Sequence, residues 1–114
     1  MVVSQGEVWW ADLPEPGGSE PGFRRPVVVV QGDSLNRSDW GTVVCVPLTG
    51  NLGWEAAPGN LRLHARATGL PKDSVAVVAL ITPINRFQLL ERAGKLSLTQ
   101  LSLLLSGIDT MLGR

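Results

Sequence analysis

The chain is poor in the residue types on which several common enzyme mechanisms depend. Its 114 residues include one cysteine, Cys45, and one histidine, His64. A single cysteine excludes an intrachain disulfide, and its position inside an apolar run predicts a buried, inert thiol. One histidine and scattered carboxylates offer no zinc-type ligand spacing, and a two-histidine ribonuclease mechanism cannot be built within one chain. We therefore expect no metal and no cofactor, and we interpret His64 as a surface residue.

An excess of one charge sign is also missing, since ten basic residues balance ten acidic ones. Without a general positive charge, contact with nucleic acid has to come from a local patch. Arg24, Arg25 and Arg37 lie close together in the sequence and could supply one. A second basic group, which we interpret as an ordinary solvated surface, consists of Arg62, Arg66 and Lys72.

Long apolar segments and phosphate-binding glycine loops are lacking too. No apolar run is long enough to span a bilayer, and Met1–Gly6 has no core of the signal-peptide type, so we expect a cytoplasmic protein without membrane contact. Neither common glycine-rich phosphate loop nor a nucleophile elbow is present. The length predicts one domain over residues 1–114.

The most informative stretch that is present is Phe23–Gln31, in which two arginines precede four valines. Such a β-branched run predicts a buried strand, and Pro26 is compatible with its first position. Arg24 and Arg25 would then stand at the end of a rigid element. An arginine fork in that place suits phosphate recognition.

Other segments predict further strands around this one. Gly6–Leu13 has strand propensity, and as a strand it would point Trp9 and Trp10 to opposite faces. Thr42–Leu48 is a second β-branched run, whose Pro47 indicates a strand end or an edge. We also predict strands over Leu61–Arg66, from its alternating pattern, and over the apolar segment Ser74–Thr82.

One helix is predicted, at the C-terminal end. Ser97 and Gln100 fit a capping box, and a shared apolar face follows, made of Leu98, Leu101, Leu105, Ile108 and Leu112. A short helical turn is expected within residues 32–39, and loops over residues 14–22 and 50–60. Short strands with a terminal helix predict a mainly β fold, a small curled antiparallel sheet or barrel.

Several motifs, taken together and in order, resemble the MazF/PemK family of toxin endoribonucleases. They are Gly6-Glu7-Val8-Trp9, Gly18-Ser19-Glu20, Gly22-Phe23-Arg24-Arg25-Pro26, Asn36-Arg37, Val46-Pro47-Leu48-Thr49 and Asp73-Ser74-Val75. The resemblance covers nearly the whole chain, although residues 50–60 match the family poorly. It implies a homodimer of small SH3-like barrels of the MazF/PemK/CcdB type. It also implies metal-independent, sequence-specific cleavage of single-stranded mRNA by 2′-hydroxyl attack, leaving 2′,3′-cyclic phosphate and 5′-hydroxyl ends. A cognate acidic, MazE-like antitoxin would neutralise the toxin.

The same resemblance assigns roles to particular residues. The catalytic arginine and threonine of the family fall on Arg25 and Thr49. Glu20 is a hypothetical acceptor for the 2′-hydroxyl proton, with a solvated loop residue as the alternative. We expect RNA contacts from Arg24, Ser19, Arg37 and Trp54, although an aromatic residue in such a loop more often packs beneath the loop itself, and this is the alternative for Trp54.

Two other function classes remain as alternatives. A toxin of the same fold could bind and poison a protein such as gyrase, as CcdB-like toxins do, and its toxicity would then survive loss of Arg25. A non-catalytic small-barrel module could use Trp9, Trp10 or Trp54 to bind a peptide or RNA without turnover.

Overall fold

The valine-rich segments form the centre of one antiparallel sheet in the computed structural model, which describes residues 2–13 and 24–114. The strands are β1 (Glu7–Asp12), β2 (Arg24–Val29), β3 (Thr42–Thr49), β4 (Leu61–Leu63), β5 (Ser74–Ala76), β6 (Thr82–Asn85) and β7 (Leu89–Lys95). The α-helices are α1 (Asp33–Asn36), α2 (Ala65–Thr68) and α3 (Leu98–Leu112), and the 3₁₀ helices are η1 (Leu52–Ala56), η2 (Val78–Leu80) and η3 (Arg86–Gln88).

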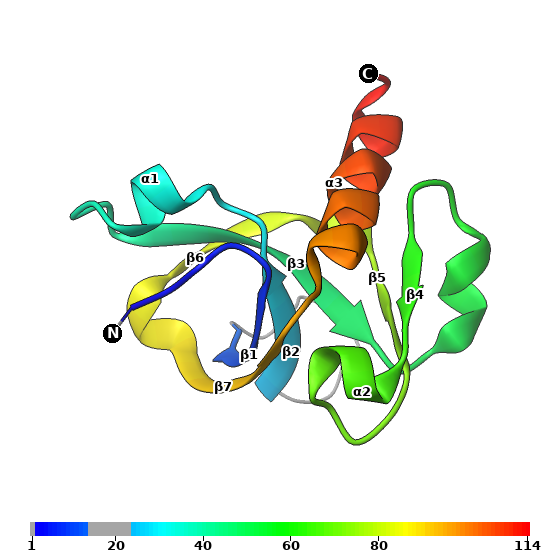
Figure 1. Cartoon of the computed structure of the whole chain (residues 1–114), viewed down its shortest axis with the longest axis horizontal. Coiled ribbons are helices and arrows are strands. Elements are labelled where there is room, and N and C mark those ends of the chain that lie inside the picture. The colour runs from blue at the N-terminus through cyan, green and yellow to red at the C-terminus, as the bar shows by residue number, and fades with distance from the viewer. Residues whose placement is uncertain (1, 14–23) are drawn as a thin grey trace.

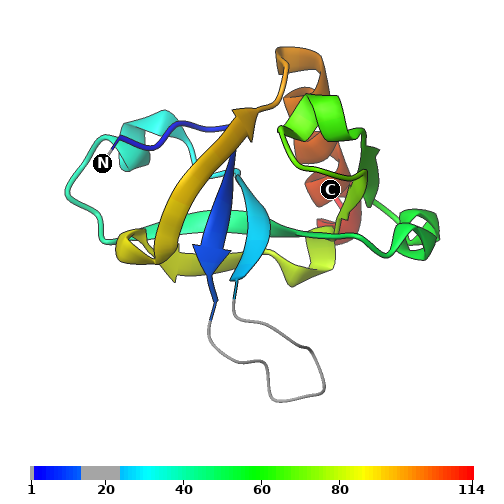
Figure 2. The same cartoon turned by 90° about the horizontal axis from the view of Figure 1, so that it is seen from below.

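The sheet curls into a half-barrel with the C-terminal helix against one end (Figure 1). Its strand order is β4-β5-β3-β2-β1-β7, and β6 pairs with the other half of β3. Figure 2 shows β7, β1 and β2 side by side, with β3 running across behind them. The predicted mainly β fold with a C-terminal helix is confirmed.

Strand β2 is a continuous valine run because both of its faces are buried. Val28 and Val30 pack into a cluster with Leu104 of α3, whereas Val27 and Val29 pack into a second cluster with Trp9. A strand that is buried on one face alternates apolar and polar residues, whereas a strand that is covered on both faces is apolar throughout. Full burial of a valine stabilises a fold by roughly 1.5–3 kcal/mol, so this strand is a major source of stability.

Trp9 and Trp10 of β1 point to opposite faces, as the sequence predicts. Trp9 is 8% exposed and belongs to the same cluster as Val27. Trp10 is only half-buried and contacts the other cluster. One indole is therefore core and the other reaches the surface.

Pro47 lies inside β3 and does not end it, because β3 changes partner at that point. Residues 42–45 pair with β6, and residues 48–49 pair with β5. The Pro47 carbonyl accepts from the Val77 N–H on that same side of the strand. The nitrogen of a strand residue points to the same side as its carbonyl, so the N–H that Pro47 lacks is missing on the side of Val77 and costs no bond to β2.

Two predicted strands are wrong in extent. The strand predicted over Leu61–Arg66 stops at Leu63, and Arg66 lies in α2. The segment Ser74–Thr82 is broken by η2, because the chain must cross from one half of β3 to the other before pairing again as β6. In neither segment does the pattern of apolar residues reveal where the strand stops.

Helix α3 begins as predicted, with the Ser97 side chain accepting from the Gln100 N–H. Its buried face consists of Leu101, Leu104 and Ile108, so the expected stripe is displaced: Leu98 and Leu112 are exposed. None of the helices in the described part of the chain is long and apolar enough to cross a membrane.

A close crossing of two glycines joins α3 to the loop before β4. A Cβ on Gly107 would collide with the carbonyl oxygen of Gly59, whose own φ of +83° favours glycine. Alanine normally stabilises a helix interior by about 1 kcal/mol relative to glycine, but overpacking against backbone costs about 1–3 kcal/mol.

We expect Gly107→Ala to lower the free energy of unfolding in urea titrations. Gly41→Ala, at an exposed site with open space around it, serves as the control and should change stability by less than about 0.5 kcal/mol; a stabilised Gly107→Ala protein would contradict the packing argument.

Cys45 is buried in the cluster around Val27 and Trp9, as the sequence predicts. Burial raises the pKa of its thiol to about 12, so almost none of the reactive thiolate forms near neutral pH.

We expect the native protein to resist a thiol-labelling reagent at about pH 8 and the guanidinium-unfolded protein to react at once, as followed by mass spectrometry. Rapid labelling without unfolding would show that this core opens.

Candidate active site

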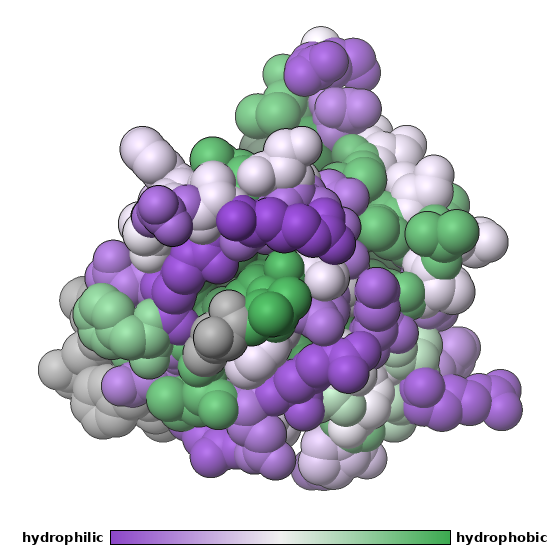
Figure 3. Space-filling view, turned by 60° about the vertical axis from the view of Figure 1, so that its left-hand side comes forward, coloured by the Kyte–Doolittle hydropathy of each residue, from purple (hydrophilic) through white to green (hydrophobic). Residues whose placement is uncertain are grey.

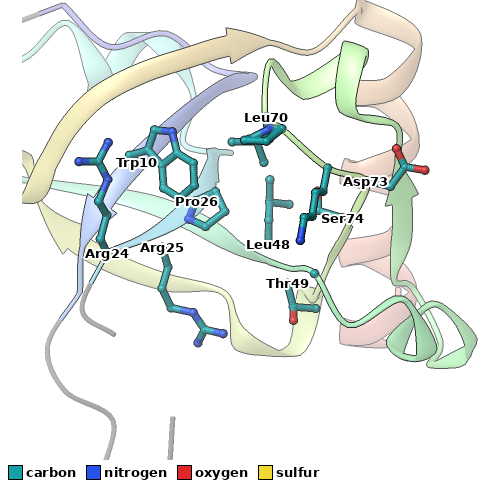
Figure 4. A pocket seen from close by; sticks show the side chains of 12 residues that line it. Trp10, Arg24, Arg25, Pro26, Leu48, Thr49, Leu70, Asp73 and Ser74 are labelled. Carbon is teal, nitrogen blue, oxygen red and sulfur yellow. The ribbon is translucent and has the colours of Figure 1, made fainter. Parts of the chain in front are cut away.

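The two arginines at the start of β2 make different contacts, although both line the first of the two hollows described below. Arg24 donates to Glu91 of β7 at 3.0 Å, and its guanidinium carbon lies 5.1 Å from the centre of the Trp10 ring. Arg25 is half-buried and extends toward the side where Thr49 lies (Figure 4). Arg24 is thus held in a cation–π and ion-pair contact, and Arg25 faces the groove described next.

Thr49 ends β3, the neighbour of β2. The observed register pairs Val27 with Pro47, and extending it by two residues brings Arg25 and Thr49 to corresponding positions. The Thr49 hydroxyl oxygen accepts from the Asn51 N–H at 3.2 Å. This bond fixes the oxygen and leaves the hydroxyl hydrogen available for donation to a ligand.

Arg25 and Thr49 lie between two neighbouring hollows and line both of them. The first has a volume of about 310 Å³, and the second about 220 Å³. Leu48 is the other residue that they share. Together the hollows form a groove, which we call the Arg25–Thr49 groove, with the arginine and the threonine near its middle.

Polar residues make one wall of the first hollow, opposite Trp10 and Pro26 (Figure 4). They are Lys72, Asp73 and Ser74. The Ser74 hydroxyl is buried and has no hydrogen-bond partner among the described residues. This wall therefore offers a cation and a carboxylate to a polar ligand, whereas the Ser74 hydroxyl itself is shielded from solvent.

Asp73 is held by three groups at the edge of the first hollow. Its carboxylate accepts from the Ala65 N–H at 2.9 Å and from Arg62 at 3.2 Å, and lies 3.3 Å from His64 Nδ1. These contacts, with the Ala65 N–H as the largest contribution and Arg62 next, lower the pKa of Asp73. The bond to Ala65 also satisfies the first turn of α2, which explains why the chain leaves the extended conformation at His64.

The second hollow is mainly apolar. Trp54 of η1 is 51% exposed and lines it together with Pro47, Val77 and Leu80. Trp54 therefore does not pack away beneath its own loop, and it keeps a free aromatic surface beside Arg25.

The remaining candidate residues fall elsewhere. Arg37 follows α1 and pairs with Asp33 at 3.6 Å. It lines a separate hollow with Arg86. Figure 3 shows the side of the molecule on which α1 lies in Figure 1, where apolar patches (green) lie between polar ones (purple). The structure does not bring Arg37 to the Arg25–Thr49 groove. Ser19 and Glu20 lie outside the described residues, so their roles stay predictions.

Sequence reasoning missed Lys72, Ser74 and Leu80 as groove residues. Lys72 was assigned to a solvated surface, and Leu80 was assigned to a strand. Their place in the groove follows from the pairing of Thr49 with Val75, which puts the start of β5 beside the end of β3 and which no local sequence pattern reports. Within the described residues, no group of three or more His, Cys, Asp or Glu gathers as a metal site would require.

Comparison with known proteins decides the family. The model of the family described as "PemK-like, MazF-like toxin of type II toxin-antitoxin system" matches residues 4–112. The chain belongs to this family.

Relatives of this PemK/MazF-like chain bear names that state an activity. Endoribonuclease MazF6 of Mycobacterium tuberculosis is 45% identical over 95 residues, which are 83% of each protein. The crystal structure of MazF from Deinococcus radiodurans has a TM-score of 0.79 at 20% identity and covers 100% of this chain and 99% of its own. A mycobacterial endoribonuclease in complex with its cognate antitoxin has a TM-score of 0.73 at 20% identity, covering 98% and 94%. At such identities the structures establish the shared fold.

The lowered pKa of Asp73 predicts a pH-dependent stability. Because the folded-state pKa lies below the unfolded value of about 3.9, the contacts of Asp73 stabilise the fold above that pH and lose their effect as pH falls through the folded pKa. Asn mimics the neutral carboxyl, so Asp73→Asn should be less stable than wild type in urea at pH 7, and this difference should shrink steadily as the pH falls below the unfolded-state pKa. The matched control is Asp39→Asn, which changes an exposed carboxylate. If the stability difference between Asp73→Asn and wild type does not shrink in acid, the stabilising role of the Asp73 carboxylate is contradicted.

Proposed function

We propose that this member of the toxin family is a metal-independent, sequence-specific endoribonuclease that cleaves single-stranded mRNA at the Arg25–Thr49 groove. The supporting observation is the position of Arg25 and Thr49 between two hollows, in a chain 45% identical to a named endoribonuclease. RNA supplies its own nucleophile, the 2′-hydroxyl, so the protein needs to orient the phosphate, stabilise charge and move protons.

In this mechanism the 2′-oxygen attacks the adjacent phosphorus and the bond to the 5′-oxygen breaks. The products are a 2′,3′-cyclic phosphate and a 5′-hydroxyl: the 2′-hydroxyl proton passes to the general base, and the leaving 5′-oxygen takes a proton from solvent water. Arg25 binds the non-bridging phosphate oxygens and stabilises the added charge on the phosphorane. Its guanidinium has a pKa above about 12 in proteins generally, so we assign it electrostatic stabilisation and not simple acid catalysis.

Thr49 donates its hydroxyl hydrogen to the scissile phosphate, with its oxygen held by the Asn51 N–H. Glu20 is the proposed acceptor of the 2′-hydroxyl proton. Ser19 and Arg37 are proposed to contact RNA away from the scissile bond. Arg24, fixed on Trp10 and Glu91, is proposed to attract the backbone as a supporting charge.

The proposed partners follow from the same groove. A cognate acidic antitoxin of the MazE type would compete with RNA by laying carboxylates against Arg24, Arg25 and Lys72, with coupled folding and binding. We propose that residues 1–114 act as one toxin domain, that two such domains form the active homodimer, and that the protein works in the cytoplasm.

Arg25→Ala should reduce RNA cleavage by about 10²–10³-fold, the usual loss when one preorganised charge-stabilising donor is removed. Arg25→Lys keeps the charge but loses the two-pronged donor geometry, so it should recover only part of the rate. The assay incubates purified protein and RNA with excess chelator and identifies 2′,3′-cyclic phosphate ends by mass spectrometry.

Arg66→Ala is a suitable control, because it removes an exposed arginine that does not line the groove. It should cleave as wild type does. Intact RNA across many sequences would refute the proposal, and toxicity that survives Arg25→Ala would favour a poison of a protein target such as gyrase. Saturable RNA binding without turnover would favour a non-catalytic binding module.

A further inference from the structure

The wall of the second hollow has two large apolar side chains beside the reaction centre. Trp54 and Leu80 are 51% and 52% exposed, yet they come from separate 3₁₀ helices, η1 and η2, and line the same hollow. Among the described residues that line this hollow, Arg25 is the only one with an ionisable side chain. Apolar surface is thus presented directly next to a phosphate-binding charge.

Asn60 holds these two helices together. Its side-chain amide donates to the Trp54 carbonyl at 2.9 Å, and its side-chain oxygen accepts from the Val78 N–H at 3.1 Å. One side chain therefore joins the helix that carries Trp54 to the helix that carries Leu80. The apolar wall is built before any ligand arrives, which lowers the entropy cost of binding.

A second bond connects the wall to the reaction centre. The Asn51 N–H donates to the Thr49 hydroxyl oxygen, and the Asn51 side chain accepts from the Gly53 N–H at the start of η1. The threonine at the end of β3 and the tryptophan of η1 are therefore set relative to each other within five residues of chain.

We propose, on the basis of the endoribonuclease function above, that Trp54 and Leu80 form a stacking subsite for one nucleobase adjacent to the scissile phosphate. A phosphate held by Arg25 and Thr49 places the base of a neighbouring nucleotide at one of the two hollows that these residues separate. The apolar hollow offers an aromatic face to that base, whereas the first hollow offers the polar wall of Lys72, Asp73 and Ser74.

This subsite contributes affinity more than sequence selection. Every base has a π face, so stacking on an aromatic side chain tolerates all four bases and contributes roughly 1–3 kcal/mol per base. By the same figure, loss of the indole should lower kcat/KM by roughly 5- to 150-fold. The preference for one base over another at this position should be the same in the variant, because stacking does not distinguish between bases.

The test uses the full chain and a short single-stranded RNA containing a cleavage site mapped by sequencing the fragments. Trp54→Ala should lower kcat/KM in the stated range, and Trp54→Phe should retain most of it. Trp40→Ala is the matched control, since Trp40 is a tryptophan of similar exposure, 56%, that lines neither hollow. Leu80→Ala provides a second variant if Trp54→Ala does not fold.

Abasic ribonucleotides on either side of the cleaved bond identify the stacked base. They retain the 2′-hydroxyl, so the chemistry is intact. Wild type and Trp54→Ala should cut one of the two abasic RNAs at equal rates. Wild type should still cut the other abasic RNA faster than Trp54→Ala does. Asn60→Ala should slow cleavage in the wild-type background and should have a smaller effect in the Trp54→Ala background, whereas general destabilisation would lower the rate equally in both.

The outcomes separate this proposal from the one on which it rests. If wild type cuts RNA and Trp54→Ala cuts equally well, the stacking subsite is refuted and the endoribonuclease stands. The same holds if the loss is uniform on all RNAs, or if Trp54→Ala weakens only the binding of an antitoxin. If wild type cuts no RNA, both proposals fail.

Discussion

The antiparallel pairing of β2 with β3 is the constraint on which the rest of the structure depends. Residues 27–29 and 45–47 are buried between two hydrophobic clusters, one against α3 and one inside the curled sheet. Both strands are therefore held rigidly, and their ends carry Arg25 and Thr49. Side chains placed on strand ends need little reorganisation when a ligand binds, which is the condition for the electrostatic catalysis that we propose for this pair.

Polar side chains build the groove outward from this pair. Asp73 ties the start of α2 to the turn before β5, Asn51 ties Thr49 to η1, and Asn60 ties η1 to η2. Each bond joins segments that the sheet alone would leave unconnected. The result is two hollows of different chemistry, polar on one side and apolar on the other, on either side of one arginine.

This arrangement explains how a chain without net charge and with one histidine can serve the proposed reaction. The substrate brings the nucleophile, so a fixed guanidinium, a hydroxyl donor and a proton acceptor suffice. Arg24 is balanced by Glu91, and Arg62 by Asp73 and Glu55. Neutral composition is thus compatible with a local site for phosphate.

Local sequence patterns account for the elements that depend on neighbours in the chain. The valine run of β2, the opposite faces of Trp9 and Trp10, the buried Cys45 and the Ser97 cap follow from local patterns, and the motif resemblance identified the family. The tertiary structure decided what depends on pairing between distant segments. The break of Ser74–Thr82 at η2 follows from where β3 changes partner. The end of β4 at Leu63 follows from the bond between Asp73 and the Ala65 N–H, which starts α2. The exposure of Leu98 follows from where α3 meets the sheet. Apolar patterns cannot report these events, because a leucine that packs in a core and a leucine that lines a groove, such as Leu80, look the same until the chain is folded.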